Sequence, residues 1–239
     1  MLSFKNWDNK TWISSKKYIQ SFNNFLLKQK KLNKNSKILD IGCGRGKIMG
    51  SLSSKLKLIH KPIGLDIENH KDFDKRITFK KINAIQYLRS NKKKFDLILI
   101  KQTIHLFNLK DIKKVLTYSH SSLEIGGIIL ILTLATKNNE IPTFFLMKHK
   151  LNQSFKRDIL IWKNLLQLNI KKNITKFNFK VNITKKNYIE MIEQRYISTL
   201  LNLNDLQILN GIKEIEAKYK NKIIFNDRLN CVMFKKIKL

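Results

Sequence analysis

The segment KILDIGCGRG, residues 37–46, places an acid and three glycines at the end of an apolar run. Asp40 lies within the run, and Gly42, Gly44 and Gly46 follow at every second position. Glycines after a strand let the backbone turn sharply and let a ligand touch the main chain. A carboxylate at that point disfavours a pyrophosphate and favours a ligand with positive charge. The segment therefore predicts a cradle for a cationic ligand.

Polar residues at the ends of three later apolar runs could complete this site. Asp66 closes the run PIGLD, and a carboxylate at the tip of a second strand can accept both hydroxyls of a ribose. The next run ends in INA, where Asn83 could face the edge of an adenine. The fourth run ends in KQTIH, residues 101–105, where ligands gather in open α/β sheets. The four ends together indicate one nucleoside site.

The elements that must position these residues alternate between strands and helices. Residues 1–35 read as helix, because Ile19, Phe22 and Leu26 share one stripe at helical spacing. Asn108 could cap a later helix that runs to about Leu123. Strands are expected at 37–41, 62–67, 77–84, 95–101 and 126–134, with a helix near 46–56. Alternating strands and helices predict a parallel sheet with right-handed crossovers.

The pattern changes after residue 135 into two aromatic-rich helical segments, a strand at 174–183 and helices at about 184–197 and 204–219. The chain closes on a strand or hairpin. A single domain over 1–239 is expected, divided into an N-terminal helical segment (1–35), a ligand-binding core (36–135), a helical cap with one sheet strand (136–220) and a terminal strand (221–239).

As a set, these motifs resemble those of class I S-adenosylmethionine (SAM)-dependent methyltransferases. LDIGCGRG is similar to the family's first motif, GLD to its acidic second-strand motif, FDLILIKQTIHLF to its fourth-strand motif and LEIGGIILIL to its fifth. The resemblance covers about residues 35–135. It implies an α/β, Rossmann-like fold with a mostly parallel seven-stranded sheet, flanking helices and a helical cap. It also implies SAM as cofactor, a small-molecule methyl acceptor and no metal.

The resemblance assigns cofactor contacts to residues of the four strand ends: Asp40, Gly42, Cys43, Gly44, Gly46, Asp66, Ile67, Asn83, Ala84 and Lys101. Many members carry Asp where this chain has Asn83, whose amide oxygen could still accept from the adenine amino group. Cys43 reads as a small filler between glycines. Residues expected to face the acceptor are Trp7, Trp12, Gln102, His105, Phe144 and Arg195.

Two residues near the fourth strand carry catalytic expectations. His105 could position or deprotonate the acceptor, or could be a helix-start histidine bonded to the backbone. Lys101 could attract an acceptor that carries negative charge. Arg195, near Ser198 and Thr199, could clamp a carboxylate or pair with a nearby glutamate. The remaining histidines share no spacing and are expected at the surface.

The net charge of +31 allows two interpretations. A basic surface could bind nucleic acid, and an RNA or tRNA methyltransferase is an alternative function. Compositional drift is the other, because only six of the 48 basic residues are Arg, the residue favoured for phosphate contacts, and the lysines are spread along the chain. A protein that binds SAM without transferring its methyl group is a further alternative function.

Several classes are disfavoured by the sequence. No apolar stretch is long enough to span a membrane, and the N-terminus lacks the apolar segment of a signal peptide. Two cysteines make no disulfide framework, so a cytoplasmic protein is expected. Pro62 and Pro142 are the only prolines, which excludes the Pro-Pro turn of adenine-N6 enzymes. Cytosine-C5 chemistry requires a catalytic cysteine near the end of the fourth strand, and the sequence has none there.

Overall fold

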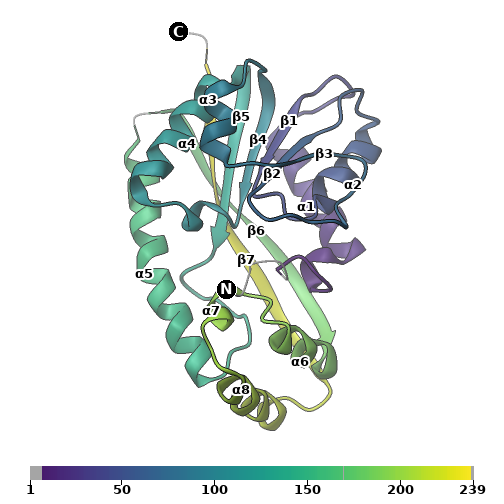
Figure 1. Ribbon diagram of the computed structural model, residues 1–239, viewed down its shortest axis with the longest axis vertical. Helices are drawn as coiled ribbons and strands as arrows, with labels where there is room; N and C mark the ends of the chain where they lie inside the picture. The colour runs from purple at the N-terminus through teal and green to yellow at the C-terminus, as the bar shows by residue number, and fades with distance from the viewer. Residues whose placement is uncertain (1–6, 169, 238–239) are drawn as a thin grey trace.

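A seven-stranded sheet with the order β3-β2-β1-β4-β5-β7-β6 forms the centre of the computed structural model, which describes residues 7–168 and 170–237 (Figure 1). The strands are β1 (Ile38–Ile41), β2 (Ile63–Asp66), β3 (Thr78–Lys81), β4 (Phe95–Lys101), β5 (Leu123–Leu134), β6 (Lys172–Thr184) and β7 (Lys222–Lys235). The first five pair in parallel, and β7 runs antiparallel between β5 and β6. This sheet confirms the expected Rossmann-like fold class.

The central strands are buried on both faces, as their apolar sequences predict. Along β4, Leu97 and Leu99 face one hydrophobic cluster, while Ile98 and Ile100 face the other. This alternation follows from the two-residue period of a strand. Helices α1 (Lys16–Gln29) and α2 (Lys47–Leu56) pack in the first cluster, and α3 (Ala84–Ser90) and α4 (Leu109–Ser121) in the second.

Side-chain caps start several of these helices. The Asn108 side chain accepts a hydrogen bond from the backbone N–H of Asp111 and starts α4, as the sequence predicts. Asn83 does the same for α3, a helix that the sequence reading missed. The third strand is therefore shorter than the expected 77–84, because the chain leaves the sheet before this cap.

The helices of the second half of the chain form a cap that extends below the carboxyl ends of the parallel strands (Figure 1). It comprises α5 (Phe145–Gln167), α6 (Lys185–Glu193), α7 (Ser198–Leu201) and α8 (Asp205–Lys218). The two helical segments expected before the sixth strand form the single helix α5, and the closing segment is one strand without a hairpin. Of the described part of the expected helix, residues 7–35, only 16–29 is α-helical, and a 3-10 turn at Trp12–Ser14 precedes it; residues 1–6 lie outside the described residues.

Candidate cofactor and acceptor site

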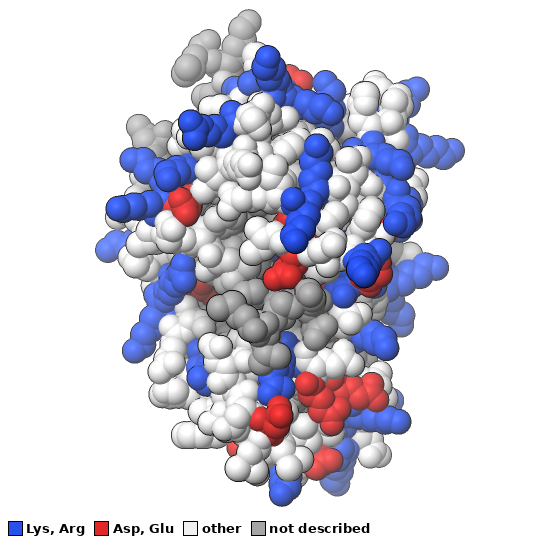
Figure 2. All heavy atoms as spheres, viewed as in Figure 1, with Lys and Arg blue, Asp and Glu red and all other residues white. Residues whose placement is uncertain are grey.

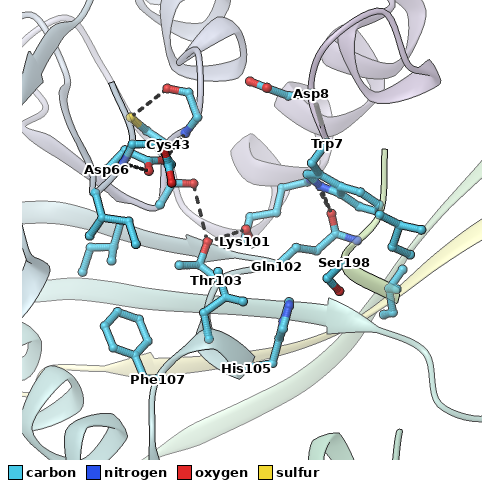
Figure 3. A pocket seen from close by; sticks show the side chains of 18 of the residues that line it. Trp7, Asp8, Cys43, Asp66, Lys101, Gln102, Thr103, His105, Phe107 and Ser198 are labelled. Atoms are coloured by element: carbon cyan, nitrogen blue, oxygen red, sulfur yellow. Dashed lines mark hydrogen bonds between the residues drawn. The ribbon is translucent and has the colours of Figure 1, made fainter. Parts of the chain in front are cut away.

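A cavity of about 560 Å³ opens at the carboxyl ends of β1, β2 and β4. This volume falls within the range of small-molecule and cofactor sites, and this edge of an open α/β sheet is where such sites form. The glycine turn and the tip of β2 line one part of the cavity. Residues of α5 and α7 line another, and Trp7 and Asp8 lie over it from the N-terminal segment (Figure 3).

The three glycines of the turn all have left-handed backbones, with φ of 72°, 53° and 68° for Gly42, Gly44 and Gly46. A Cβ on Gly42 would collide with the Thr103 side chain, and one on Gly44 would lie 2.6 Å from Asp8 Oδ2. Gly42 and Gly44 line the cavity, as expected for cofactor contacts. Gly46 does not: it faces Ile77 and begins α2, so its role is to shape the turn.

Cys43 is a packed thiol within this turn. Its Sγ donates a hydrogen bond to the Gly44 carbonyl over 3.3 Å and packs against Gly64 (Figure 3). Burial, followed by the nearby carboxylates of Asp40 and Asp66, raises the pKa of the thiol well above its usual value. Cys43 therefore stays protonated and acts as the small filler that the sequence suggests.

Asp66 is held in place at the tip of β2. Its Oδ2 accepts a hydrogen bond from Gly44 N at 2.8 Å, and its Oδ1 accepts one from Glu68 N at 3.0 Å. Each oxygen keeps a further lone pair, which suits a pair of ribose hydroxyls. His70 Nε2 lies 3.9 Å from Oδ2 and lines the cavity. The expectation that His70 lies at the surface is wrong, because the chain folds it back under Phe79.

The adenine end of the expected site is formed by Asn83, Ala84 and Ile67, which all line the cavity. The Asn83 amide oxygen caps α3 by accepting from Ile85 N at 2.8 Å and Gln86 N at 3.3 Å. This oxygen is therefore occupied, contrary to the expectation that it serves the adenine amino group. The Asn83 NH₂ group and the Ala84 N–H donate to no described residue, so donors rather than acceptors remain here.

Asp40, the acid next to the glycine turn, has a strongly raised pKa. Its side chain lines the cavity and is only 5 % exposed. Burial raises the pKa of Asp40 from 3.8 to about 7, Lys101 opposes the rise, and the carboxylates of Asp66 and Asp8 add to it. A ligand that brings positive charge would favour the ionised form. SAM carries an ammonium and a sulfonium, so the residues present fit this cofactor.

Lys101 and Gln102 form the tip of β4 next to this acid. Lys101 Nζ donates to Gln102 Oε1 at 3.2 Å and lies 5.4 Å from the Tyr18 ring centroid. Burial lowers the pKa of Lys101 to about 8, while Asp227 and Asp40 oppose the decrease. Its charge thus faces two carboxyl groups of the protein itself.

Gln102 adopts a left-handed backbone with φ of 53°, which is rare for a residue other than glycine. Its Oε1 also accepts from Trp7 Nε1 at 2.8 Å (Figure 3). The contact joins the N-terminal segment to the tip of β4. Trp7 and Gln102 both line the cavity, and their contact with an acceptor stays a prediction.

His105 lies in a 3-10 turn at Ile104–Leu106, directly after β4. It lines the cavity (Figure 3). Burial and the charge of Arg157 lower the pKa of His105 to about 4. The imidazole is therefore neutral near pH 7 and can donate or accept a hydrogen bond, although it is a weak base.

Two of the residues expected at the acceptor, Trp12 and Phe144, lie in the core instead. Trp12 is buried, lies outside the cavity lining and donates from Nε1 to Asp227 Oδ2 at 2.9 Å. Phe144 is buried in the cap against Gly211 and also lies outside the lining. Both predictions of acceptor contact are wrong, because these rings fill the core.

Arg195 does line the cavity, together with Ser198 and Thr199. Its Nη2 donates to the Leu203 carbonyl at 2.9 Å and to Asp205 Oδ1 at 2.8 Å. The expected pairing with a nearby glutamate is replaced by this bond to Asp205 at the start of α8. The guanidinium is thus engaged by the protein.

The sequence reading missed several cavity residues, notably Asp8, His70, Arg157 and Asp158. Asp8 accepts from Arg45 N at 2.7 Å and pairs with its guanidinium at 2.6 Å, which fastens the N-terminal segment to the glycine turn. Asp158 could have been recognised from the sequence, because it is an acid within the apolar stripe of a helix. Among the described residues, no cluster of His, Cys, Asp and Glu could hold a metal ion.

Comparisons with known proteins agree with this geometry. A family model for a methyltransferase domain matches residues 13–167. The fold is similar to a SAM-dependent methyltransferase from Archaeoglobus fulgidus (19 % identity, 91 % of this chain and 94 % of that chain, TM-score 0.52). It is also similar to the plantazolicin methyltransferase BpumL in complex with a pentazolic desmethylPZN analog and S-adenosylhomocysteine (SAH) (17 % identity, 97 % of this chain and 88 % of that chain, TM-score 0.53).

A methyltransferase fold from Bacillus halodurans is similar as well (14 % identity, 91 % of this chain and all of that chain, TM-score 0.55). At these identities the structural likeness establishes the fold. No curated protein sequence matches the chain. Across the described residues, no helix has the length and apolar character needed to cross a membrane.

Proposed function

The chain belongs to the methyltransferase-domain family, and we propose that it transfers a methyl group from SAM to a small-molecule acceptor. SAM supplies a methyl group on a positively charged sulfur, which leaves as a neutral thioether. Asp40 attracts the cationic part of the cofactor, Asp66 accepts from the ribose, and Asn83 and Ala84 donate to the adenine. These roles follow from the position of each residue at the strand ends.

The rest of the chain's contribution is to position the reactants and exclude water. Gln102 and His105 lie beside the tip of β4, where the acceptor would meet the methyl group. Alignment of an acceptor with the methyl carbon can supply several kcal/mol of a reaction barrier. Because positive charge disappears in the transition state, a site with little water favours the transfer.

The roof of the cavity, formed by Trp7 and Asp8, is the observation that supports a small acceptor. Trp7 stacks on Tyr196, with ring centroids 6.0 Å apart and an interplanar angle of 11°. It also donates to Gln102, while Asp8 binds Arg45 across the glycine turn. These contacts cover the cavity from the N-terminal side, which supports an acceptor small enough to enter beneath them.

The surroundings of Lys101 argue against the expected negatively charged acceptor. That expectation depended on Lys101, which is surrounded by Asp227, Asp40 and aromatic rings. An anion at this point would have to compete with two carboxyl groups for one ammonium.

The test is methyl uptake from labelled SAM in a cell extract separated into metabolite, RNA and protein fractions. We expect label in the metabolite fraction alone. Label only in RNA or protein would contradict a small acceptor. Binding of SAM without label in any fraction would indicate a protein that binds the cofactor without turnover.

RNA is a second candidate acceptor because the net charge is +31. On the face shown in Figure 2, however, Lys and Arg are scattered rather than gathered into one track, and acidic side chains group in its lower part. An RNA enzyme would bind tRNA with an affinity that falls steeply as salt rises. A shallow salt dependence would favour the small-molecule acceptor.

A further inference from the structure

The inner face of α5 carries one acid among apolar side chains. The buried residues of this helix are Met147, Leu151, Phe155, Asp158, Ile161 and Leu165. Their spacing of three and four residues defines a stripe that faces the protein interior. Asp158 is the only charged member and is only 8 % exposed. Burial of a carboxyl group is costly, so its presence in this stripe calls for a partner.

The part of the chain that the structure describes supplies no such partner. Among residues 7–168 and 170–237, no hydrogen bond or ion pair to the Asp158 side chain is found. The neighbouring Arg157 sends Nη2 to the carbonyl of Phe107 at 2.6 Å instead. The other guanidinium of the cavity wall, that of Arg195, is bound to Leu203 and Asp205. Both guanidinium groups therefore donate to acceptors other than Asp158, although Arg195 Nε has no partner among the described residues.

Asp158 faces the cavity on its acceptor side. The bond from Arg157 to Phe107 anchors this turn of α5 against the segment that follows β4. His105 lies in that segment and shares the cavity with Asp158. An unpaired carboxyl group therefore lies in the part of the cavity where the methyl acceptor is expected.

We propose that the methyl acceptor is an amine, and that Asp158 binds its ammonium form and takes up the proton that must leave before transfer. This inference rests on the proposed methyltransferase function. Aromatic and aliphatic side chains around the acid, among them Leu151 and Phe155, would hold the apolar part of such an amine.

The proton balance of the step is simple. An ammonium proton passes to the Asp158 carboxylate, which frees the nitrogen lone pair. That pair forms the new bond to the methyl carbon, the bond from carbon to sulfur breaks, and its electron pair stays on sulfur. The product is a methylammonium, and Asp158 then releases its proton to solvent. One proton is released for each methyl group transferred.

The ionisation of the neighbouring groups agrees with this assignment. Burial raises the pKa of Asp158 to about 6, and Arg157 opposes the rise. A base in this range is ionised at pH 7 and can still accept a proton. His105, with a pKa lowered to about 4, is a weaker base and can orient the nitrogen by a hydrogen bond. Other elements also contribute charged groups to the lining of this cavity, among them Arg195, Lys101, Asp40 and Asp111.

The test compares matched ligands on the SAH-loaded protein by calorimetry. Phenethylamine and 3-phenylpropionate have similar apolar parts and opposite charges. We expect phenethylamine to bind roughly tenfold or more tightly than 3-phenylpropionate, the effect of one hydrogen bond to a charged group. Its affinity should fall as pH drops below about 6, where Asp158 becomes neutral. Equal binding, tighter binding of the carboxylate, or binding of neither ligand would contradict the proposal.

Two variants separate this inference from the proposed function. Asp158→Asn should remove the preference for the amine and leave SAH affinity unchanged. Glu193→Gln, which removes an exposed acid outside the cavity, should keep the preference. A preference that survives Asp158→Asn would overturn the role of Asp158. Failure of the wild-type protein to bind SAH would instead refute the proposed function, and the inference with it.

Discussion

Replacement of Asp40 by Asn should stabilise the protein at high pH. The folded state raises the pKa of Asp40 from 3.8 to about 7, chiefly through burial. The folded protein therefore binds more protons than the unfolded chain between these values, and its stability falls as pH rises through this window. Asn carries no titrating proton, so the variant should lack this loss.

The magnitude follows from the shift. About three pKa units correspond to about 4 kcal/mol of unfavourable free energy once the group is ionised in both states. At pH 5 only about 1.6 kcal/mol of this penalty is present, because the unfolded chain ionises there and the folded protein does not. With some relaxation around the charge, the advantage of Asp40→Asn should be about 2 kcal/mol larger at pH 8 than at pH 5.

Urea unfolding of both proteins at the two pH values, without ligand, measures this difference. Any constant cost of the Asn side chain cancels, because only the change in the advantage between pH 5 and pH 8 is compared. The two proteins should have equal m-values. If Asp40→Asn changes the free energy of unfolding equally at both pH values, or more favourably at pH 5, the burial of an ionisable Asp40 side chain at the glycine turn is refuted.

Three further predictions concern the cavity and the cap. Asp66→Ala should weaken SAH binding roughly tenfold to a hundredfold, the worth of hydrogen bonds to a charged group, and unchanged calorimetric affinity would contradict the ribose role. Asp8→Ala should speed SAH dissociation in stopped-flow measurements, because Arg45 no longer ties the roof to the glycine turn; an unchanged rate would mean that the roof does not control release. Phe144→Ala should lower the free energy of unfolding by about 3–5 kcal/mol and leave SAH affinity intact, and weaker SAH binding in the folded variant would speak against a purely structural ring.

The sequence predicted the half of the site that lies on the parallel strands. Asp40, the glycines and Asp66 occupy strand ends, where local pattern fixes both the element and the position of its last residue. Lys101 and His105 were placed at the tip of β4 for the same reason. What local pattern could not show is which groups these side chains meet.

The cap side was harder to predict because its residues meet only through long-range packing. Trp12 and Phe144 are aromatic residues in the expected segments, yet both turn into the core, and nothing in their immediate neighbourhood marks that direction. Asp8 and His70 reach the site because loops fold back over the glycine turn. Asp158 is the exception, since an acid in the buried stripe of a long helix can be seen once that helix is recognised as continuous.

Calorimetric titration of the purified protein with SAM and SAH tests the central claim most directly. A single site that binds both ligands, with a weaker response in Asp40→Asn, is the predicted result, because a carboxylate and bare backbone form the cradle for the cationic part of SAM. The absence of heat with either ligand, together with full binding of a pyrophosphate-containing dinucleotide such as NAD, would contradict it.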